Sequence, residues 1–201
     1  MDVLGRDFYD RDTLQVAQEL LGCRLVREVE GEHLVGRITE TEAYIGRCDK
    51  ACHAYGYKRT NRTETLFAQP GTAYLYLIYG MYTCLNFVTE PVGEPAAVLI
   101  RSITAIEGEQ TMARLRFGRP VAELNAYQRK NFLNGPGKVC KALNLDRSVN
   151  GHDLLTPPLY VLPRDIELPA IHCGPRIGVD YAQEAKDFPW RFWVDMERES
   201  P

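Results

Sequence analysis

The stretch CRLVREVEGEHLVGRITETEAY, residues 23–44, decides the fold because apolar and polar residues alternate on both sides of a turn. Alternation with a period of two is typical of half-buried β-strands, and it predicts strands over residues 23–29 and 33–44. Glu30 and Gly31 between them can make the tight turn of a hairpin. We therefore expect an antiparallel sheet that extends outward from this hairpin.

The second strand of the hairpin would present a mixed face. With a period of two, the side chains that share this face are those of Ile38, Glu40, Glu42 and Tyr44. A glutamate on a strand is most often solvated or paired with a cation, so the pattern leaves a structural role open. Two carboxylates beside an aromatic ring also fit a catalytic surface.

The flanking segments complete the domain. Asp12 and Thr13 can begin a helix that Gly22 ends, and residues 45–69 predict a long loop. Periodicity further along predicts helices over residues 107–117, 121–132 and 137–145, and strands over residues 72–79, 82–88, 97–103, 176–179 and 191–194. Strands and helices mix without regular βαβ alternation. The predicted fold class is therefore α+β, a single domain over residues 1–201 with a curved, mainly antiparallel β-sheet and surrounding helices.

The composition indicates a cytoplasmic protein. The 201 residues are 45% hydrophobic, which suffices for one core. The N-terminus has no apolar run and the most apolar stretch, residues 75–88, is interrupted by polar residues, so neither a signal peptide nor a membrane span is expected. Six scattered cysteines indicate free thiols rather than a disulfide framework. We expect a monomer that contacts no membrane.

The net charge of −3 argues mildly against a polyanionic partner, but the distribution of charge favours one. Residues 47–62 carry five cations against one acid, and residues 111–147 carry eight cations against two acids. The remainder of the chain must be acidic. This segregation predicts one face that meets phosphate, with solvated helix faces as the alternative interpretation.

Several aromatic residues could serve an enzyme that acts on a base inside duplex DNA. Such an enzyme must take the base out of the stack, which requires a side chain to fill the gap, an aromatic pocket and a catalytic group. Tyr79 at the tip of the second hairpin is a candidate wedge. Tyr44, His53 and Tyr76 can stack on the base, and electron-rich rings attract a purine made cationic by alkylation. Tyrosines on strands also commonly pack a core, so each role is open.

The same chemistry needs a carboxylate. Hydrolysis of a glycosidic bond passes through a positively charged sugar, so one carboxylate can deprotonate water and stabilise that charge. Glu40 and Glu42 are the candidates. Cys48, Cys52 and His53 are zinc-binding residue types, but no fourth ligand with paired spacing accompanies them, so no metal is expected. A nucleophile elbow and a phosphate-binding glycine loop are also missing from the sequence, and no cofactor is expected.

Longer motifs make the interpretation more specific. RITETEAYIG, DKACHAY, LFAQPGTAYLYLIYGMYTCLN, VLIRS, NGPGKVCKAL and PRIGVDYA follow one another in this order. Together they resemble the alkyladenine (3-methyladenine) DNA glycosylase family over about residues 8–194. The resemblance implies a monofunctional base-excision repair enzyme of the bacterial cytoplasm, bound to the nucleoid through DNA. It would flip alkylated or deaminated purines from duplex DNA and hydrolyse the N-glycosidic bond with an activated water, leaving an abasic site.

The resemblance also implies residue roles. Glu42 corresponds to the general base and Glu40 to a supporting residue, with Arg101 and the backbone carbonyl of Ile177 positioning the water. Tyr44 would stack on one face of the base and His53 and Tyr76 on the other, Asn86 would disfavour normal guanine, and Tyr79 would intercalate. The implied phosphate contacts are Lys58, Arg62, Lys138, Arg147 and the backbone near Gly178. Leu66 lies where the family places a larger apolar residue, and Lys58 lacks the bidentate fork of an arginine.

Two other classes of function fit part of the pattern. A non-catalytic protein that binds damaged DNA would use the same wedge and basic segments without releasing a base. An RNA-directed or nucleotide-modifying enzyme would place different chemistry on this fold. A glycosylase with lyase activity needs an amine nucleophile, and the matching pocket segments contain no lysine.

Overall fold

The computed structural model describes residues 2–78 and 80–196 of the chain. Eight strands form one sheet in the order β3-β4-β5-β2-β1-β6, and β8 joins β2 to β7. Every pairing between these strands is antiparallel. The strands are β1 Arg24–Val29, β2 Glu32–Ile45, β3 Ala73–Ile78, β4 Tyr82–Val88, β5 Ala96–Glu107, β6 Leu159–Leu162, β7 His172–Gly174 and β8 Arg191–Trp193. The predicted α+β class with a mainly antiparallel sheet is confirmed.

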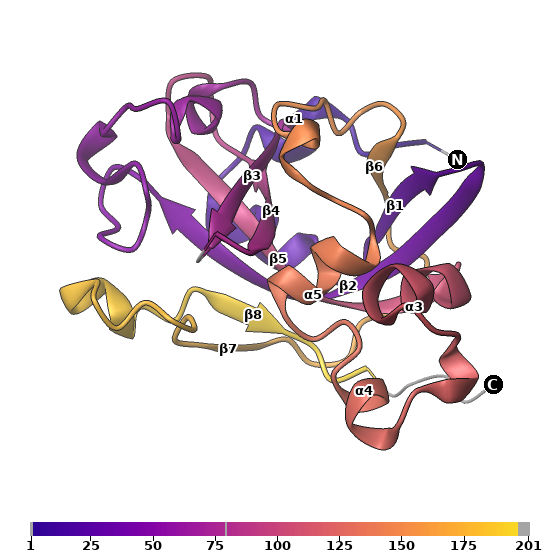
Figure 1. Ribbon diagram of the computed structural model, residues 1–201. Coiled ribbons are helices and arrows are strands. Elements are labelled where there is room, and N and C mark those ends of the chain that lie inside the picture. Colours follow the sequence, from indigo (N-terminus) through magenta and orange to yellow (C-terminus); the bar gives the residue numbers. More distant parts are fainter. Residues whose placement is uncertain (1, 79, 197–201) are drawn as a thin grey trace.

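Short helices surround the sheet. The α-helices are α1 Arg6–Tyr9, α2 Thr13–Glu19, α3 Glu109–Phe117, α4 Ala126–Lys130 and α5 Pro136–Ala142. Single 3-10 turns are η1 Tyr55–Tyr57, η2 Glu64–Phe67, η3 Val121–Glu123, η4 Arg147–Val149 and η5 Gln183–Asp187. In Figure 1, α3, α4 and α5 gather at the lower right, and the β7–β8 pair lies at the lower left. The site therefore has helices on one side and this short pair on the other.

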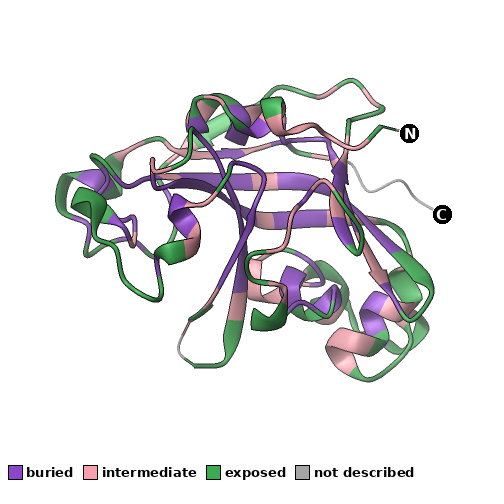
Figure 2. Cartoon of the chain, turned by 90° about the horizontal axis from the view of Figure 1, so that it is seen from above, coloured by how far each residue is buried: buried purple, intermediate pink, exposed green. Residues whose placement is uncertain are grey.

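The core follows from the predicted alternation. The side chains of β1, β2, β4 and β5 that face the helices form one large apolar cluster with α2, α3 and α5. Figure 2 shows the buried strands crossing the middle of the molecule, with exposed loops around its periphery. Asp12 begins α2 as predicted, because its Oδ1 accepts hydrogen bonds from the amides of Leu14 at 3.0 Å and Gln15 at 3.1 Å. The helix fixes the position of β2, since Thr41 Oγ1 donates to the carbonyl of Ala17 at 2.7 Å.

One predicted helix and one predicted strand are wrong. The segment 121–132 is a 3-10 turn followed by α4, because Asn125 begins a new helix with a reciprocal capping pair to Gln128. Residues 176–179 are irregular, and the strand of that region is β7 instead. The Arg176 side chain donates to the Ala43 carbonyl and the Ile177 amide donates to the Glu42 side chain, so these contacts with β2 involve side chains rather than a backbone ladder. A single sequence gives no signal for such contacts.

The predicted face of β2 is also wrong at one position. Ile38 lies opposite Ile103 and Glu40 lies opposite Ser102, so one extra residue of β2 forms a bulge between them. The bulge reverses the alternation. Ile38 therefore packs in the main core together with Ala43, whereas Glu42 lies on the opposite face.

Two expectations from the composition concern membrane-spanning helices and the state of the cysteines. No helix in residues 2–78 and 80–196 is long and apolar enough to cross a membrane. All six cysteines are free thiols; Cys23, Cys52, Cys84 and Cys140 are buried, and Cys48 and Cys173 are exposed. Four of them are therefore small core residues, as expected, and two are on the surface.

Candidate active site

A cavity of about 310 Å³ opens where the middle of the sheet meets two loops. The loops are residues 51–66 after β2 and residues 177–181 before η5. Of the residues singled out from the sequence, Glu42, Tyr44, His53, Arg62, Leu66, Tyr76, Asn86, Arg101, Ile177 and Gly178 line this one cavity. Residues 135 positions apart in the chain thus meet at Glu42 and Ile177.

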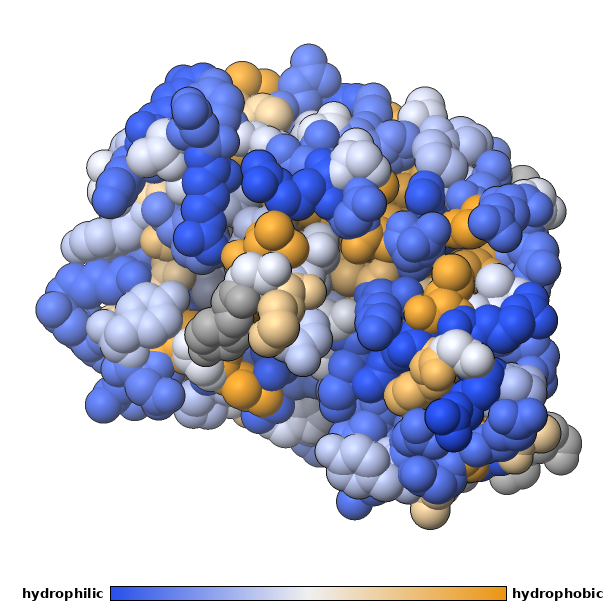
Figure 3. Space-filling view, in the orientation of Figure 1, coloured by the Kyte–Doolittle hydropathy of each residue, from blue (hydrophilic) through white to orange (hydrophobic). Residues whose placement is uncertain are grey.

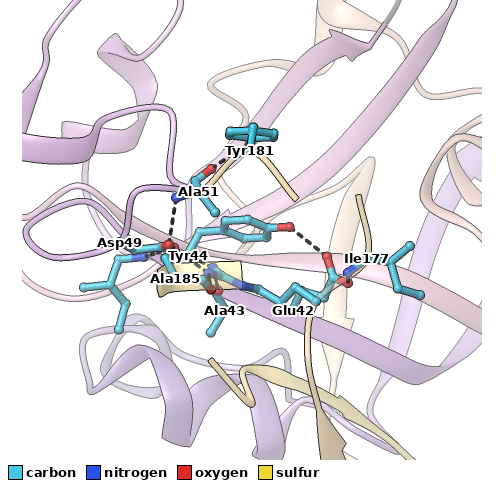
Figure 4. A network of polar contacts seen from close by, with 10 residues as sticks. Glu42, Ala43, Tyr44, Asp49, Ala51, Ile177, Tyr181 and Ala185 are labelled. Atoms are coloured by element: carbon cyan, nitrogen blue, oxygen red, sulfur yellow. Dashed lines mark hydrogen bonds and ion pairs between the residues drawn. The ribbon is translucent and has the colours of Figure 1, made fainter. Parts of the chain in front are cut away.

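Glu42 is the central acid of the cavity. Its side chain is fully buried, and each carboxylate oxygen has a hydrogen-bond donor: the Tyr44 hydroxyl at 2.8 Å on Oε2 and the Ile177 amide at 2.9 Å on Oε1. Figure 4 shows the Tyr44 hydroxyl pointing toward the carboxylate, with Ile177 beyond it. Ile177 contacts Glu42 through its backbone amide. The role predicted from the sequence, positioning the water, was for its backbone carbonyl.

Arg101 supplies the nearest positive charge. A second irregularity in the pairing of β2 and β5 leaves Arg101 without a partner across from it, between Ser102 and Ile100. Its guanidinium lies 3.4 Å from both Glu40 Oε1 and Glu42 Oε1. The two bulges in neighbouring strands therefore bring the cation and both acids to the same face.

Opposing effects act on the Glu42 carboxyl. Burial raises the pKa of Glu42, while the charge of Arg101, the Ile177 amide and the Tyr44 hydroxyl each lower it. Burial is the largest of these effects, so the pKa of Glu42 lies above the ordinary value. A carboxylate with a raised pKa is a stronger base once it is ionised.

Tyr44 forms one wall of the cavity. The guanidinium carbon of Arg176 lies 4.7 Å from the centre of its ring, so a cation packs against this ring. Burial raises the pKa of Tyr44 well above its usual value, which keeps the hydroxyl protonated as a donor to Glu42.

His53, Tyr74 and Tyr76 form an aromatic cluster in the same cavity. The rings of His53 and Tyr76 meet edge to face at 4.5 Å, and those of Tyr74 and Tyr76 are tilted at 5.4 Å. Arg62 Nη2 lies 3.2 Å from His53 Nε2, and a guanidinium can only donate, so Nε2 accepts. The proton of the neutral ring is then on Nδ1, which donates to the Tyr74 hydroxyl at 3.1 Å. Burial, helped by the charge of Arg62, lowers the pKa of His53 to about 4, so this ring is neutral at physiological pH.

Asn86 occupies the β4 side of the cavity. Its side chain is buried, and its Nδ2 donates to the carbonyl of Tyr74 at 3.2 Å on the neighbouring strand. This bond fixes the amide group, because the carbonyl of Tyr74 can only accept. The Oδ1 atom keeps its lone pairs for a donor inside the cavity.

Of the predicted DNA-contacting residues, Arg62 and Gly178 line the cavity. Lys58 and Arg147 are exposed, and Gly178 is an exposed part of the cavity wall with a φ of 77°. Lys138 Nζ donates to the side-chain oxygens of Asn131 at 3.1 Å and Asn134 at 2.8 Å. Tyr79, the predicted wedge, lies outside the described residues.

Only part of the positive charge of residues 47–62 is free of ion pairs. In residues 47–62, Arg47, Lys50 and Arg59 pair with Glu90, Glu184 and Glu64. Within the described part of the chain, Lys58 and Arg62 have no carboxylate within 4.0 Å. The positive charge of the first segment is therefore concentrated next to the cavity, where Arg62 lines the wall.

An apolar surface adjoins the cavity. Leu77, Met81 and Tyr82, beside the turn of the β3–β4 hairpin, are 40%, 73% and 52% exposed. Figure 3 shows apolar side chains near the middle of the face that carries this hairpin, with hydrophilic side chains around them. Exposed apolar groups of this size at a hairpin end are typical of a contact surface.

The zinc interpretation gains no support from the geometry. Cys52 packs in an apolar cluster with Ala54 and Tyr74, and His53 Nδ1 and Nε2 both have other partners. Among residues 2–78 and 80–196, no three His, Cys, Asp or Glu side chains are grouped to hold a metal ion.

Comparison with known proteins identifies the family. The sequence model of the family Methylpurine-DNA glycosylase (MPG) matches residues 7–198. The chain belongs to this family. Relatives named "Putative 3-methyladenine DNA glycosylase" include those of Clostridium perfringens, 53% identical over 95% of both chains, and Clostridium tetani, 53% identical over 96% of this chain and 95% of its own. The relative of Desulfitobacterium hafniense is 50% identical over 97% of this chain and 96% of its own. The resemblance derived from the motifs is thereby confirmed.

This methylpurine-DNA glycosylase family member has a buried ion pair that sequence analysis missed. The side chains of Arg176 and Asp49 are both fully buried and pair with each other. Arg176 also donates to the carbonyl oxygens of Ala43 at 2.8 Å and Ala185 at 3.0 Å. The available signal was its place in PRIGVDYA directly before Ile177 and Gly178, the two residues of that motif with predicted roles.

Proposed function

We propose that this protein excises alkylated purines from duplex DNA by hydrolysing the N-glycosidic bond. The observation that carries the proposal is the convergence of a buried carboxylate, Glu42, and the rings of Tyr44, His53 and Tyr76 on one cavity of about 310 Å³. Sites for small ligands usually have volumes of about 300–1,000 Å³, so this one suits a single nucleobase. A base inside a duplex reaches such a cavity only when it is flipped out of the stack.

Stacking selects the damaged base. An alkylated purine carries positive charge on its ring, and a cation is attracted to the faces of aromatic side chains. We assign Tyr44 to one face of the flipped base and His53 with Tyr76 to the other. Because His53 is neutral at physiological pH, it does not repel a cationic base. Asn86 bonds to the Tyr74 carbonyl through Nδ2 and not through Oδ1, and it is assigned to discrimination against normal guanine.

The hydrolysis is assigned to Glu42 as general base. A water molecule next to the carboxylate loses its proton to Glu42 as it attacks the sugar carbon, and the base leaves with the bonding electrons. The negative carboxylate also stabilises the positive charge that develops on the sugar. The charge of Arg101 and the Ile177 amide favour the ionised carboxylate against the effect of burial and orient it, and the backbone at Ile177 is also assigned to hold the water.

DNA binding is assigned to the surface around the cavity. Lys58, Arg62, Lys138, Arg147 and the backbone at Gly178 would contact phosphate, which requires positive charge or free amides. Tyr79 would fill the gap left by the flipped base, assisted by the exposed apolar groups beside it in the hairpin.

Base-release chromatography tests the proposal. Duplexes that each contain one 3-methyladenine, 7-methylguanine, hypoxanthine or ethenoadenine are incubated with the wild type and with Glu42→Gln. Release by the wild type and a loss of about 10²- to 10⁴-fold in Glu42→Gln with retained binding are expected. A protein that binds damaged duplex but releases no base would be the non-catalytic alternative. A covalent adduct trapped by borohydride would overturn the water mechanism, because only an amine nucleophile forms a Schiff base.

A further inference from the structure

Arg176 contacts both parts of the site that the proposed function uses. Its guanidinium packs on the ring of Tyr44 at 4.7 Å, and its own peptide leads into the Ile177 amide that donates to Glu42 at 2.9 Å. Its Nη1 also donates at 2.8 Å to the carbonyl of Ala43, the residue between Glu42 and Tyr44 on β2. One side chain thus contacts the backbone between the base and the stacking ring.

The guanidinium is itself held from several directions. Nη1 and Nη2 form a bidentate pair with Asp49, and Nη2 also donates to the carbonyl of Ala185 at 3.0 Å. Trp190 lies on the guanidinium as well, 5.2 Å from its ring centre. A planar fork that stacks between two rings while donating to three partners is a geometry that lysine cannot reproduce.

A gain in stability does not explain why this ion pair is buried. Both side chains are fully buried, and burying a charge pair commonly contributes less stability than an apolar pair of the same volume. Arg176 of this pair packs on the Tyr44 ring and bonds to the β2 backbone next to Glu42. This position is suited to fixing the geometry of Tyr44 and Glu42. Figure 4 shows the residues of this network around Tyr44, with Asp49 and Ala51 on one side of the ring and Glu42 and Ile177 on the other.

We propose that Arg176 is a positioning residue that sets the distance and angle between the Glu42 carboxylate and the Tyr44 ring. The inference rests on the proposed function, because it concerns the rate at which the same site breaks the glycosidic bond. Arg176 does not line the cavity that the proposed function assigns to the base. It acts through Ala43, Tyr44 and the Ile177 amide.

The test compares Arg176 with Arg37, a second buried arginine whose aspartate partner does not line the cavity. Arg37 lies on β2, is largely buried, and donates through Nη1 to Asp165 at 2.6 Å and to the carbonyl of Gly22 at 3.2 Å. Arg176→Lys and Arg37→Lys each keep the charge and lose the fork. Single-turnover rates of base release are measured with excess enzyme on a duplex containing 7-methylguanine. Affinity is measured with a duplex containing a stable abasic-site analogue, and the folded fraction by circular dichroism.

Per folded molecule, Arg176→Lys should lower the single-turnover rate about 10- to 100-fold, since misplacing a catalytic group by about 1 Å has effects of this order. Its affinity for the abasic duplex should change far less. Arg37→Lys should keep the wild-type rate within about 2-fold, because distant sites act independently. An Arg176→Lys protein with the wild-type rate per folded molecule would overturn the proposal. An inactive wild type would instead refute the proposed function.

A second variant keeps the test decisive if Arg176→Lys does not fold. Asp49→Asn leaves the guanidinium and its bonds to Ala43 and Ala185 in place but weakens the fork. The proposal expects a smaller loss of rate at unchanged affinity for the abasic duplex. If Asp49→Asn has the wild-type rate per folded molecule, Arg176 serves stability alone.

Discussion

Replacing Glu42 by glutamine should lower the rate of base release. As the pH rises, it should also increase the stability of the folded protein relative to the wild type. Burial raises the pKa of this carboxyl in the folded protein above the value of 4.5 for an exposed glutamate. The folded state therefore keeps the proton at pH values where the unfolded chain has lost it. As the pH rises between these two pKa values, the wild type loses stability, and above the folded value the whole penalty is present.

Glutamine fits the same space and removes the titration. Its side-chain oxygen can accept from the Ile177 amide, and its amino group can donate to the Tyr44 hydroxyl oxygen. Exchanging the carboxyl for an amide in these hydrogen bonds costs about 1 kcal/mol, independent of pH. The penalty that is removed amounts to about 1.4 kcal/mol for each unit of pKa shift, and it is present only at the higher pH. The stability of Glu42→Gln relative to the wild type should therefore increase from pH 4 to pH 8.

Urea unfolding of both proteins at pH 4, 6 and 8 measures this difference. Glu64→Gln is the matched control, because its hydrogen bond to Arg59 holds the pKa of the Glu64 carboxyl below the ordinary value. For that control the sign is reversed, since the ionised form is the one that folding favours. A Glu42→Gln difference that stays constant or falls as the pH rises would refute the reasoning that burial dominates at this carboxyl.

Three further predictions concern the surroundings of the site. Asp49→Ala should lower the free energy of unfolding in urea by about 3–5 kcal/mol, because it leaves the Arg176 cation buried without its partner, and adding Arg176→Met should restore much of the loss. The imidazole resonances of His53 should titrate near pH 4 in an NMR experiment, and Arg62→Ala should raise that midpoint by removing a nearby positive charge. A titration of His53 near pH 6.5 would contradict the burial argument. Lys58→Ala should reduce the slope of log K against log salt for duplex binding by about 0.9 if Lys58 contacts one phosphate, and Arg59→Ala, which removes a cation already paired with Glu64, should change the slope less.

Most of the strand pairing was predictable from local sequence. The strands β1, β3 and β4 lie within the predicted segments, β2 extends one residue beyond each end of its segment, and β5 continues past residue 103 to Glu107. Period-two alternation and turn residues are local signals, so the two hairpins could be predicted. The irregular segment around Arg176 was not predictable in this way. It is held by side-chain contacts to residues more than a hundred positions earlier, such as Asp49 and Ala43. Periodicity contains no information about partners at that distance.

The bulges show how a correct strand can give a partly wrong face. Alternation places Ile38 and Glu42 together, and one inserted residue between Ile38 and Glu40 separates them. Nothing in TETE marks the inserted residue, because threonine and glutamate are tolerated on either face of a strand. The motif resemblance nevertheless singled out Glu42, Tyr44 and Arg101, since a motif records the outcome of such irregularities without explaining them.

The same bulges explain how this sheet places two carboxylates and a cation on one face. In a regular pairing of β2 and β5, Glu40 and Arg101 would share a face with residues of the apolar core. The extra residue in each strand turns Glu40, Glu42 and Arg101 to one face, where Arg101 lies 3.4 Å from both acids. Ile38 and Ala43 stay in the core on the other face, so the helices keep their apolar contact. The irregular register is thus the local cost of placing buried charge beside a packed core. If regularising β2 by deletion of Thr39 left base release intact, this link between register and chemistry would be wrong.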